Sequence, residues 1–389
     1  MNFGRQFLDF EGRRISGENP FLVAENLVEL PSQLESAARR FTSGGAIGFW
    51  SYEAAQAWEP RAFPTFAPHQ QRVPPFRLVF YEKLKFESLP TIAPISVDIM
   101  TMPDSPILRE LYCGDVEKIK GYIAAGDIYQ ANMTHPFQMA CDLAPEQIYE
   151  RLRAFSAAPR AAFLEWDDFS VVSNSPETFL SLHDQILESK PIKGTIRRGK
   201  TFEEDELLKN ELLESTKNRA ENVMIVDLIR NDLGRCCHFG SIEVTELCAL
   251  QTLPTLHHLV STVRGKISPS CSPLQAFQDC FPCGSITGAP KIRAMQILSE
   301  LENIPRGISM GAIGYFGFNG SMEWSVAIRT ATFYDQCAYF RVGGGIVADS
   351  EATAEYDEMQ LKARALYSAI SNAGEATGEF KIVMAKPWH

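Results

Sequence analysis

Residues 311–347 decide the fold, and they read GAIGYFGFNGSMEWSVAIRTATFYDQCAYFRVGGGIV. Aromatic and β-branched residues recur throughout this stretch, as is typical of strands. Two breaks interrupt it: the Asn319-Gly320 pair, which favours a tight hairpin turn, and a polar turn near Asp335. The stretch therefore predicts a run of β-hairpins whose extended segments are 311–318, 324–333 and 338–347.

The region before residue 110 carries related signals. Residues 45–52, GAIGFWSY, echo residues 311–318 and hint at two similarly built sheets. Nine prolines between residues 59 and 107 separate β-type runs such as residues 76–81. The proline-rich segment predicts a boundary or an irregular crossing near residues 100–110.

Helical patterns bracket the expected strands. Val116, Ile119 and Ile123 share one helical face, and Gly126-Asp127 predicts the end of that helix. A second helical stretch follows the acidic residues 203–206 and continues towards Asn231. Strands in runs, bracketed by helices, predict an α+β architecture with substantial antiparallel sheet rather than a regular βαβ alternation.

Composition limits the class of protein. The chain has 389 residues, 45% of them apolar, and its 37 Lys and Arg against 48 Asp and Glu give a formal net charge of −11. An acidic surface repels a phosphate backbone, so we expect no nucleic-acid partner.

The N-terminal stretch lacks the layout of a signal peptide, and no run approaches the roughly 18 apolar residues of a membrane span, so we expect a cytoplasmic protein without a membrane partner. The nine cysteines are expected to be reduced.

One motif suggests a nucleotide-binding protein. Residues 194–201, GTIRRGKT, fit the phosphate-binding pattern G-x-x-x-x-G-K-[ST]. A phosphate cradle needs a helix N-terminus and a positive field directly after the lysine, yet four carboxylates follow at residues 203–206. The P-loop-like reading therefore stays a minor alternative from another functional class.

The last predicted helix offers an acidic stripe. Glu355, Glu358 and Lys362 stand at i, i+3 and i+7 and therefore project from one face. One interpretation is an exposed Glu358–Lys362 ion pair of little energetic value. The other is a pair of carboxylates that hold a hard divalent cation beside an ammonium group. The preceding glycines 343–345 favour the second, since they let backbone approach a small ligand closely.

Two more segments allow a structural and a functional interpretation. Residues 284–291, GSITGAPK, open a helix, and Ser285 could cap it or present a hydroxyl to an anion. Residues 191–195, PIKGT, place Lys193 between β-type residues and a glycine. A lone lysine at such a position is ordinarily solvated, so neither segment identifies a site by itself.

Taken together, these segments resemble the chorismate-utilising enzymes. The family's successive signatures are similar to six stretches of this chain, in the family's order and over roughly residues 110–375: SPE 175–177, PIKGT 191–195, ENVMIVDLIRND 221–232, HLVS 258–261, GSITGAPK 284–291 and GGGIVADS 343–350. The resemblance implies two large, mainly antiparallel sheets packed together and surrounded by helices. It also implies an N-terminal region like that of anthranilate synthases over residues 1–105 and a catalytic region over residues 106–380, interleaved in one globular unit.

Two positions separate the branches of this family. Members that form anthranilate carry alanine where Lys193 stands, whereas members that aminate chorismate at C4 carry lysine. Members that add water to the ring use a lysine base at the position of Gln130, and a glutamine cannot deprotonate water. The resemblance therefore implies amination at C4, which makes 4-amino-4-deoxychorismate for p-aminobenzoate and folate; anthranilate formation is the alternative within the family.

The resemblance also implies a set of roles. Glu177 matches the general acid and Lys193 the nucleophile. Glu221 and Glu358 match ligands of a Mg²⁺ cofactor, with Glu355 ligating directly or through water, and oxygen ligands are those that Mg²⁺ prefers. The remaining matched residues bind chorismate: Arg329 and the amide of Gly345 on the enolpyruvyl carboxylate, His258 near the C4 hydroxyl, and Ser285 and Lys362 elsewhere on the substrate.

The ammonia source is expected to be another chain. A glutaminase needs a nucleophilic cysteine in a sharp glycine-flanked turn, and neither Cys113-Gly114 nor Cys283-Gly284 has the second glycine. We therefore expect a separate glutamine amidotransferase subunit as partner. The end of the chain near His389 leaves no room for a fused lyase, so conversion to p-aminobenzoate is expected to need another enzyme.

Overall fold

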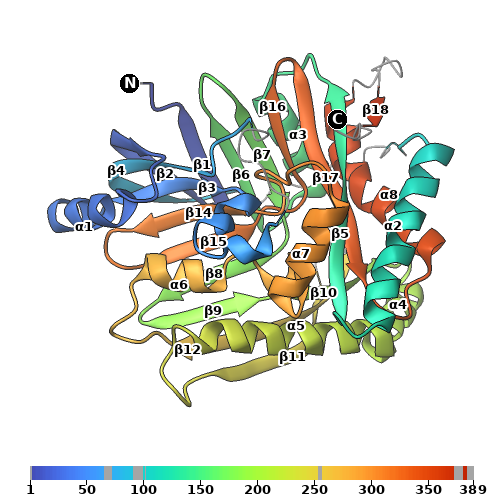
Figure 1. Cartoon of the computed structure of the whole chain (residues 1–389). Helices are drawn as coiled ribbons and strands as arrows, with labels where there is room; N and C mark the ends of the chain where they lie inside the picture. Colours follow the sequence, from blue (N-terminus) through green and yellow to red (C-terminus); the bar gives the residue numbers. More distant parts are fainter. Residues whose placement is uncertain are drawn as a thin grey trace.

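A computed structural model describes residues 2–64, 72–90, 100, 102–252, 256–371 and 380–382. The helices, which surround a large sheet (Figure 1), are α1 (Leu30–Arg40), α2 (Pro106–Ala124), α3 (Pro145–Ser156), α4 (Phe202–Glu214), α5 (Thr216–Gly234), α6 (Pro273–Cys280), α7 (Lys291–Leu301) and α8 (Ala352–Ile370), with the short 3₁₀ turns η1 (Tyr52–Ala57), η2 (Pro60–Ala62) and η4 (Gly284–Ile286).

The strands of the described residues form one 18-stranded sheet in which every pairing between named strands is antiparallel. They are β1 (Arg5–Phe10), β2 (Arg13–Ala24), β3 (Gly45–Trp50), β4 (Phe76–Ser88), β5 (Gln130–Ala140), β6 (Arg160–Glu165), β7 (Ser170–Ser175), β8 (Thr178–His183), β9 (Ile186–Lys190), β10 (Ile192–Arg197), β11 (Glu243–Thr252), β12 (Leu256–Lys266), β13 (Gly288–Ala289), β14 (Ala312–Gly317), β15 (Met322–Val326), β16 (Thr330–Tyr334), β17 (Cys337–Ile346) and β18 (Phe380–Ile382).

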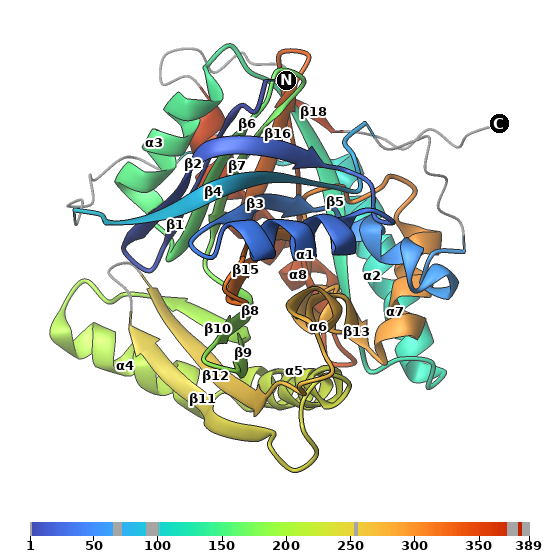
Figure 2. The same ribbon diagram turned by 90° about the vertical axis from the view of Figure 1, so that its left-hand side faces the viewer.

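Two halves of this sheet pack against each other. One half runs β5–β17–β16–β7–β6–β1, and the other runs β2–β4–β3–β14–β15–β8–β9–β12. A core that includes Phe10, Phe49 and Leu164 lies between them, and Figure 2 shows β2, β3 and β4 crossing over β6, β7 and β16. Helices α1, α5 and α6 cover the outer face of the second half, while α2, α3 and α8 cover that of the first. The result is four layers, two of helix outside two of sheet.

The α+β fold is confirmed, but the expectation of two separate sheets is corrected. The β1–β2 hairpin joins the two halves. Strand β1 pairs with β6 of the first half, β2 pairs with β4 of the second, and β1 and β2 pair with each other. Backbone hydrogen bonding therefore continues from one half into the other. The echo between residues 45–52 and 311–318 also has a different meaning, since β3 and β14 are direct neighbours, with Gly48 opposite Gly314.

Local patterns predicted most elements, with two corrections. The helix over Val116 and Ile119 is α2, and the hairpins of residues 311–347 are present. However, the segment 324–333 is not one strand: β15 pairs with β8 in one half and β16 with β7 in the other, and residues 327–329 cross between them. The second helical stretch is likewise two helices, because Ser215 ends α4 and caps the first turn of α5.

The N-terminal strands lie within this sheet, since β1 pairs with β6 and β3 with β14. The division of the chain at residues 105 and 106 stays a prediction.

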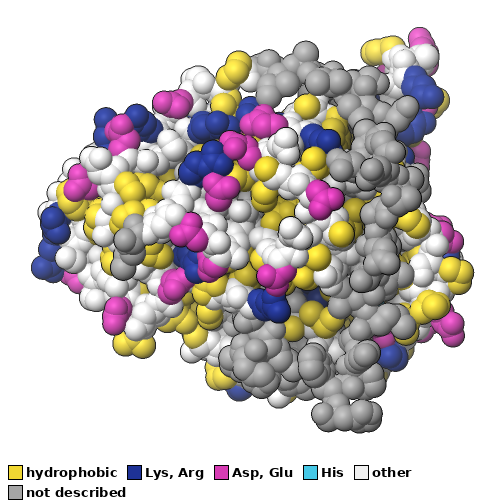
Figure 3. All heavy atoms as spheres, turned by 90° about the horizontal axis from the view of Figure 1, so that it is seen from above, with side chains coloured by type: hydrophobic (Ala, Val, Ile, Leu, Met, Phe, Trp, Pro, Cys, Tyr) yellow, Lys and Arg dark blue, Asp and Glu magenta, His cyan; other side chains and the backbone are white. Residues whose placement is uncertain are grey.

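All nine cysteines are free thiols, as expected. No helix among the described residues is long and apolar enough to cross a membrane. On the face drawn in Figure 3, basic and acidic side chains are interspersed and form no large basic area.

Candidate active site

Lys193 is directed into the site by a β-bulge. The pairing of β10 with β12 shifts between Ile192 and Thr195, so Lys193 and Gly194 fall in the irregular step. Gly194 has φ +84°, a left-handed conformation that glycine adopts without strain. The Lys193 Nζ lies only 3.3 Å from the point that a Cβ on Gly345 would occupy, so the lysine reaches from β10 to β17.

Glu177 is a buried carboxyl group near that ammonium. It lies between β7 and β8 and is 4% exposed, and its Oε1 has no hydrogen-bond partner among the described residues. Burial raises the pKa of Glu177 to about 7, although a hydrogen bond with Ser285 and the charge of Lys193 both oppose the increase. The carboxyl group can therefore hold a proton at neutral pH and donate it, as a general acid must.

Arg329 and His258 form a second part of the site. Arg329 has φ +50° in the crossing between β15 and β16, and no carboxylate of the described residues pairs with it. Burial and the nearby Arg329 lower the pKa of His258 to about 4, so its imidazole is neutral at physiological pH. His258 Nδ1 bonds with Thr195 Oγ1 at 2.7 Å, and its buried Nε2 has no hydrogen-bond partner in the described part of the chain. A largely buried, unpaired guanidinium beside a neutral imidazole suits a carboxylate ligand.

Three carboxylates approach one another from α5 and α8. Burial and the charges of Glu355 and Glu358 raise the pKa of Glu221, against the effect of Lys193 and Lys217. Glu355 is 4% exposed, and its Oε1 accepts hydrogen bonds from Ser350 Oγ at 2.7 Å and Lys217 Nζ at 3.3 Å. The three carboxylates repel one another, and nearby positive charge offsets that repulsion.

Lys362 anchors the other end of this cluster. Its Nζ is 2.7 Å from Glu358 Oε1 and donates a hydrogen bond to the Gly343 carbonyl at 3.1 Å. Burial alone would raise the pKa of Glu358, but the charges of Lys362 and other nearby lysines lower it below its usual range. The i, i+4 pair predicted on α8 is therefore present, and it also ties the helix to β17.

The three glycines of β17 leave room where other groups approach. A Cβ on Gly343 would lie 1.8 Å from the Met133 carbonyl oxygen, one on Gly344 3.2 Å from Glu355 Oε2, and one on Gly345 2.3 Å from Gln130 Nε2. Gln130 is 1% exposed, and neither atom of its amide has a partner within the described part of the chain. Sequence reasoning treated Gln130 only as a branch marker; its unsatisfied amide directed at Gly345 makes it a site residue.

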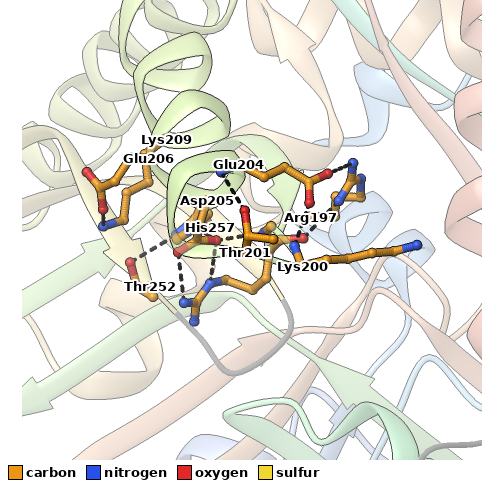
Figure 4. A network of polar contacts seen from close by, with 11 residues as sticks. Arg197, Lys200, Thr201, Glu204, Asp205, Glu206, Lys209, Thr252 and His257 are labelled. Carbon is orange, nitrogen blue, oxygen red and sulfur yellow. Dashed lines mark hydrogen bonds and ion pairs between the residues drawn. The ribbon is translucent and has the colours of Figure 1, made fainter.

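The loop after Lys193 is built as a capped helix start and not as a phosphate cradle. The Gly199 amide donates to Asp205 Oδ1 at 2.7 Å, and the Lys200 amide donates to Glu204 Oε2 at 2.6 Å. Thr201 caps α4 by accepting from the Glu204 amide, and Figure 4 shows Asp205 also joined to His257 of β12. Since the protein's own carboxylates occupy these amides and β10 is antiparallel to β12, the geometry argues against the P-loop-like alternative.

The structure brings the predicted residues into one connected site. Ser285, in η4, is 4% exposed and bonds with Glu177, which interacts with Lys193; that lysine adjoins Gly345 and interacts with Glu221 and Glu358. His258 joins this group through the backbone of Gly194. Among the described residues, no three acidic, histidine or cysteine side chains already enclose a metal position. The donor chemistry of three clustered carboxylates nevertheless fits a hard cation.

Comparison with known proteins identifies the family. The profile described as "chorismate binding enzyme" matches residues 100–368, which include every predicted site residue. The chain belongs to this family. It is therefore an enzyme of the chorismate-binding family, as the resemblance implied.

Curated relatives fall into two branches of similar identity. The chain is 41% identical over 273 residues to aminodeoxychorismate synthase component 1 of Bacillus subtilis, covering 70% of this chain and 58% of that protein. It is 44% identical over 292 residues to the chloroplastic aminodeoxychorismate synthase of Arabidopsis thaliana, covering 74% and 32%. It is 42% identical over 265 residues to anthranilate synthase component 1 of Bacillus caldotenax, covering 68% and 52%. The matches thus span between about a third and three-fifths of these relatives.

A solved structure shares the fold along most of the chain. The anthranilate synthase component I of Streptococcus pneumoniae TIGR4 superposes with a TM-score of 0.78 at 27% identity, covering 91% of this chain and 92% of that one. An isochorismate synthase structure from Bacillus anthracis, described as DhbC, superposes with a TM-score of 0.75 at 20% identity, covering 94% and 96%, and supports the fold alone.

Proposed function

We propose that the protein is component I of aminodeoxychorismate synthase, which aminates chorismate at C4. The observation that carries this proposal is the position of Lys193, whose amino group reaches the glycine-lined surface of β17 and interacts with the buried acid Glu177. The family resemblance associates lysine at this position with C4 amination. The product then leads to p-aminobenzoate and folate.

Lys193 and Glu177 divide the chemistry between them. Lys193, once its ammonium group has given a proton to solvent, attacks C2 of chorismate as a neutral amine. Both double bonds of the ring diene then shift, and the C4–O bond breaks. Glu177 gives its proton to the leaving hydroxyl, which departs as water, because hydroxide alone is a poor leaving group. Ammonia then attacks C4, both double bonds shift back, and the Lys193–C2 bond breaks to release 4-amino-4-deoxychorismate.

Separate cationic or hydrogen-bond-donating groups bind the two carboxylates of the substrate. Arg329 and the Gly345 amide hold the carboxylate of the enolpyruvyl arm, and the neutral His258 lies near the C4 hydroxyl. Ser285 and Lys362 complete the substrate contacts. The absence of a carboxylate partner for Arg329 within the described residues supports this assignment, because a largely buried guanidinium without an anion is costly.

We assign the Mg²⁺ site to Glu221, Glu355 and Glu358. When bound, the ion would anchor the ring carboxylate and withdraw electron density from the diene as a Lewis acid. The protein's contribution is to gather the carboxylates, with Ser350 holding Glu355 in place through the 2.7 Å hydrogen bond. Such support of a ligating side chain fixes its orientation.

The ammonia comes from a partner in this proposal. The Bacillus subtilis relative is named as component 1, a name that implies a second component. We propose a separate glutamine amidotransferase subunit for this chain. Anthranilate synthase component I is the second candidate, because relatives of that name match at 42% identity against 41% for the Bacillus subtilis protein.

The covalent step provides the test. Chorismate without ammonia should leave Lys193 as an adduct whose mass increase equals chorismate less one water, detected by intact-protein and peptide mass spectrometry. Lys193→Ala should lose the adduct and at least about 100-fold in ammonia-dependent turnover. Lys190→Ala is the matched control, since Lys190 lies on the adjoining β9 and pairs with Glu188 at 2.9 Å. Full turnover in Lys193→Ala would refute the covalent role.

A further inference from the structure

Lys217 is a cation that neither the sequence motifs nor the proposed reaction uses. It lies in the first turn of α5, one helical turn before Glu221, and its Nζ is 3.3 Å from Glu355 Oε1. Its side chain is 47% exposed, whereas that of Glu355 is 4% exposed. A flexible lysine from the surface therefore extends onto a fixed, buried carboxylate.

The groups around Lys217 are the carboxylates of the proposed cation site. Burial lowers its pKa, but Glu355, Glu221 and Glu358 together raise it above the usual value. These are the three carboxylates assigned to Mg²⁺. The other ammonium groups that act on them are Lys193, which acts on Glu221 and Glu358, and Lys362, which pairs with Glu358. Among the described residues, Lys217 is the one of these three lysines that forms an ion pair with Glu355.

A divalent cation and the Lys217 ammonium cannot both lie in close contact with the Glu355 carboxylate. Mg²⁺ stands about 2.0–2.1 Å from its oxygen ligands. An ion on either Glu355 oxygen would then lie within a few ångströms of the Lys217 ammonium, and the two positive charges would repel. Ser350 also donates to the same Oε1, so the carboxylate is held from a second side. Lys217 is the group that can move, because its side chain is half-exposed and its ammonium group can turn into solvent, where water hydrates the charge.

We propose that Lys217 is a competing internal cation, which occupies the carboxylate cluster until Mg²⁺ displaces it and which thereby weakens Mg²⁺ binding. The inference rests on the proposed metal site and adds a residue that regulates it. Its role is to neutralise the carboxylates in the absence of the ion and to make loading of the site depend on the concentration of free Mg²⁺.

Calorimetric titration of the full chain with Mg²⁺, at low ionic strength and without chorismate, tests this role. Lys217→Gln and Lys217→Met should bind Mg²⁺ about tenfold more tightly than the wild type, because the competitor is gone. Lys217→Arg keeps the charge and should stay within about threefold of the wild type. Lys83→Gln is the control for loss of one charge, since Lys83 is a 60% exposed lysine on β4 that pairs with Glu18.

Thermal unfolding gives a second measurement. Without Mg²⁺, both neutral variants should unfold at a lower temperature than the wild type, and saturating Mg²⁺ should raise their unfolding temperature more than it raises that of the wild type. If Glu355→Gln abolishes Mg²⁺ binding but both neutral Lys217 variants bind Mg²⁺ as the wild type does or more weakly, the inference about Lys217 is wrong and the metal site stands. Wild-type binding that is absent, or that Glu355→Gln leaves intact, would overturn the metal site and the inference with it.

Discussion

At the scale of single residues, burial sets the chemistry. Glu177 keeps its proton near neutral pH because burial raises its pKa to about 7 from 4.5, and His258 stays neutral because burial and Arg329 lower its pKa to about 4. The family resemblance selected both residues, but composition and spacing could not predict their protonation. The contact of Lys217 with Glu355 joins residues 138 positions apart, so no local pattern could indicate it.

Glu177→Gln tests the pKa of the buried acid. The folded state holds the Glu177 proton up to about pH 7, whereas an unfolded carboxyl group releases it near pH 4.5. The unfolded state therefore gains stability relative to the folded state as pH rises from 4.5 to 7, and folding stability falls. Glu177→Gln should abolish this fall and be more stable than the wild type at pH 8 by up to about 3 kcal/mol. Urea unfolding at pH 5 and pH 8 measures the difference.

Activity of the same variant separates stability from catalysis. Glu177→Gln should lose about 100-fold or more in turnover, because an amide cannot protonate the leaving hydroxyl. At a fixed concentration of free ammonia, the wild-type rate should lose the contribution of the protonated acid as pH rises above about 7, where Glu177 loses its proton, and Glu177→Gln should lack this dependence. A Gln variant with the wild-type rate would show that another group supplies the proton.

At the scale of elements, local signals predicted what short-range periodicity controls. The helix α2, the hairpins β14–β15 and β16–β17, and the acidic face of α8 follow from spacing and turn residues. The crossing at residues 327–329 stayed hidden, because the β-type pattern runs on through a segment whose two ends pair with different halves of the sheet. The break at Ser215 was equally hidden, since apolar helical spacing continues on both sides of it.

The glycines of β17 allow an element-scale prediction. Gly343→Ala should destabilise the protein by about 2–3 kcal/mol, because its Cβ would lie 1.8 Å from a backbone oxygen of the paired β5. Gly344→Ala is the matched comparison, since its Cβ would meet only the ends of two side chains, Glu355 Oε2 at 3.2 Å and Lys362 Nζ at 3.5 Å, and it should cost less than about 1 kcal/mol. Equal losses in chemical denaturation would refute the role of the strand contact.

At the scale of the whole molecule, long-range pairing builds the site. Lys193 on β10, Glu355 on α8 and Ser285 in η4 meet because antiparallel strands return the chain to the same layers many residues later. The continuity of the sheet through β1 and β2 could not be predicted, since pairings such as Phe7 with Phe163 leave no mark in local sequence. The continuous sheet makes us expect one cooperative unfolding transition.

A buried charge near the junction of the halves allows a prediction about the stability of that junction. Glu323 of β15 is 3% exposed and pairs with Arg13 of β2 at 3.2 Å and with Arg160 of β6 at 3.0 Å. Glu323→Ala should cost about 3–5 kcal/mol, because it leaves the buried Arg160 without one of its two carboxylates. His183→Ala removes only a half-exposed partner of Glu323 and should cost less than about 1 kcal/mol. Comparable losses in urea titrations would contradict this account of the junction.

The product of the reaction tests the central claim most directly. Purified protein is incubated with chorismate, Mg²⁺ and excess ammonium, and the products are resolved by mass spectrometry with and without an added aminodeoxychorismate lyase. The account predicts 4-amino-4-deoxychorismate, which the lyase converts to p-aminobenzoate. Anthranilate formed without the lyase would contradict it and would show that Lys193 does not determine the position of amination.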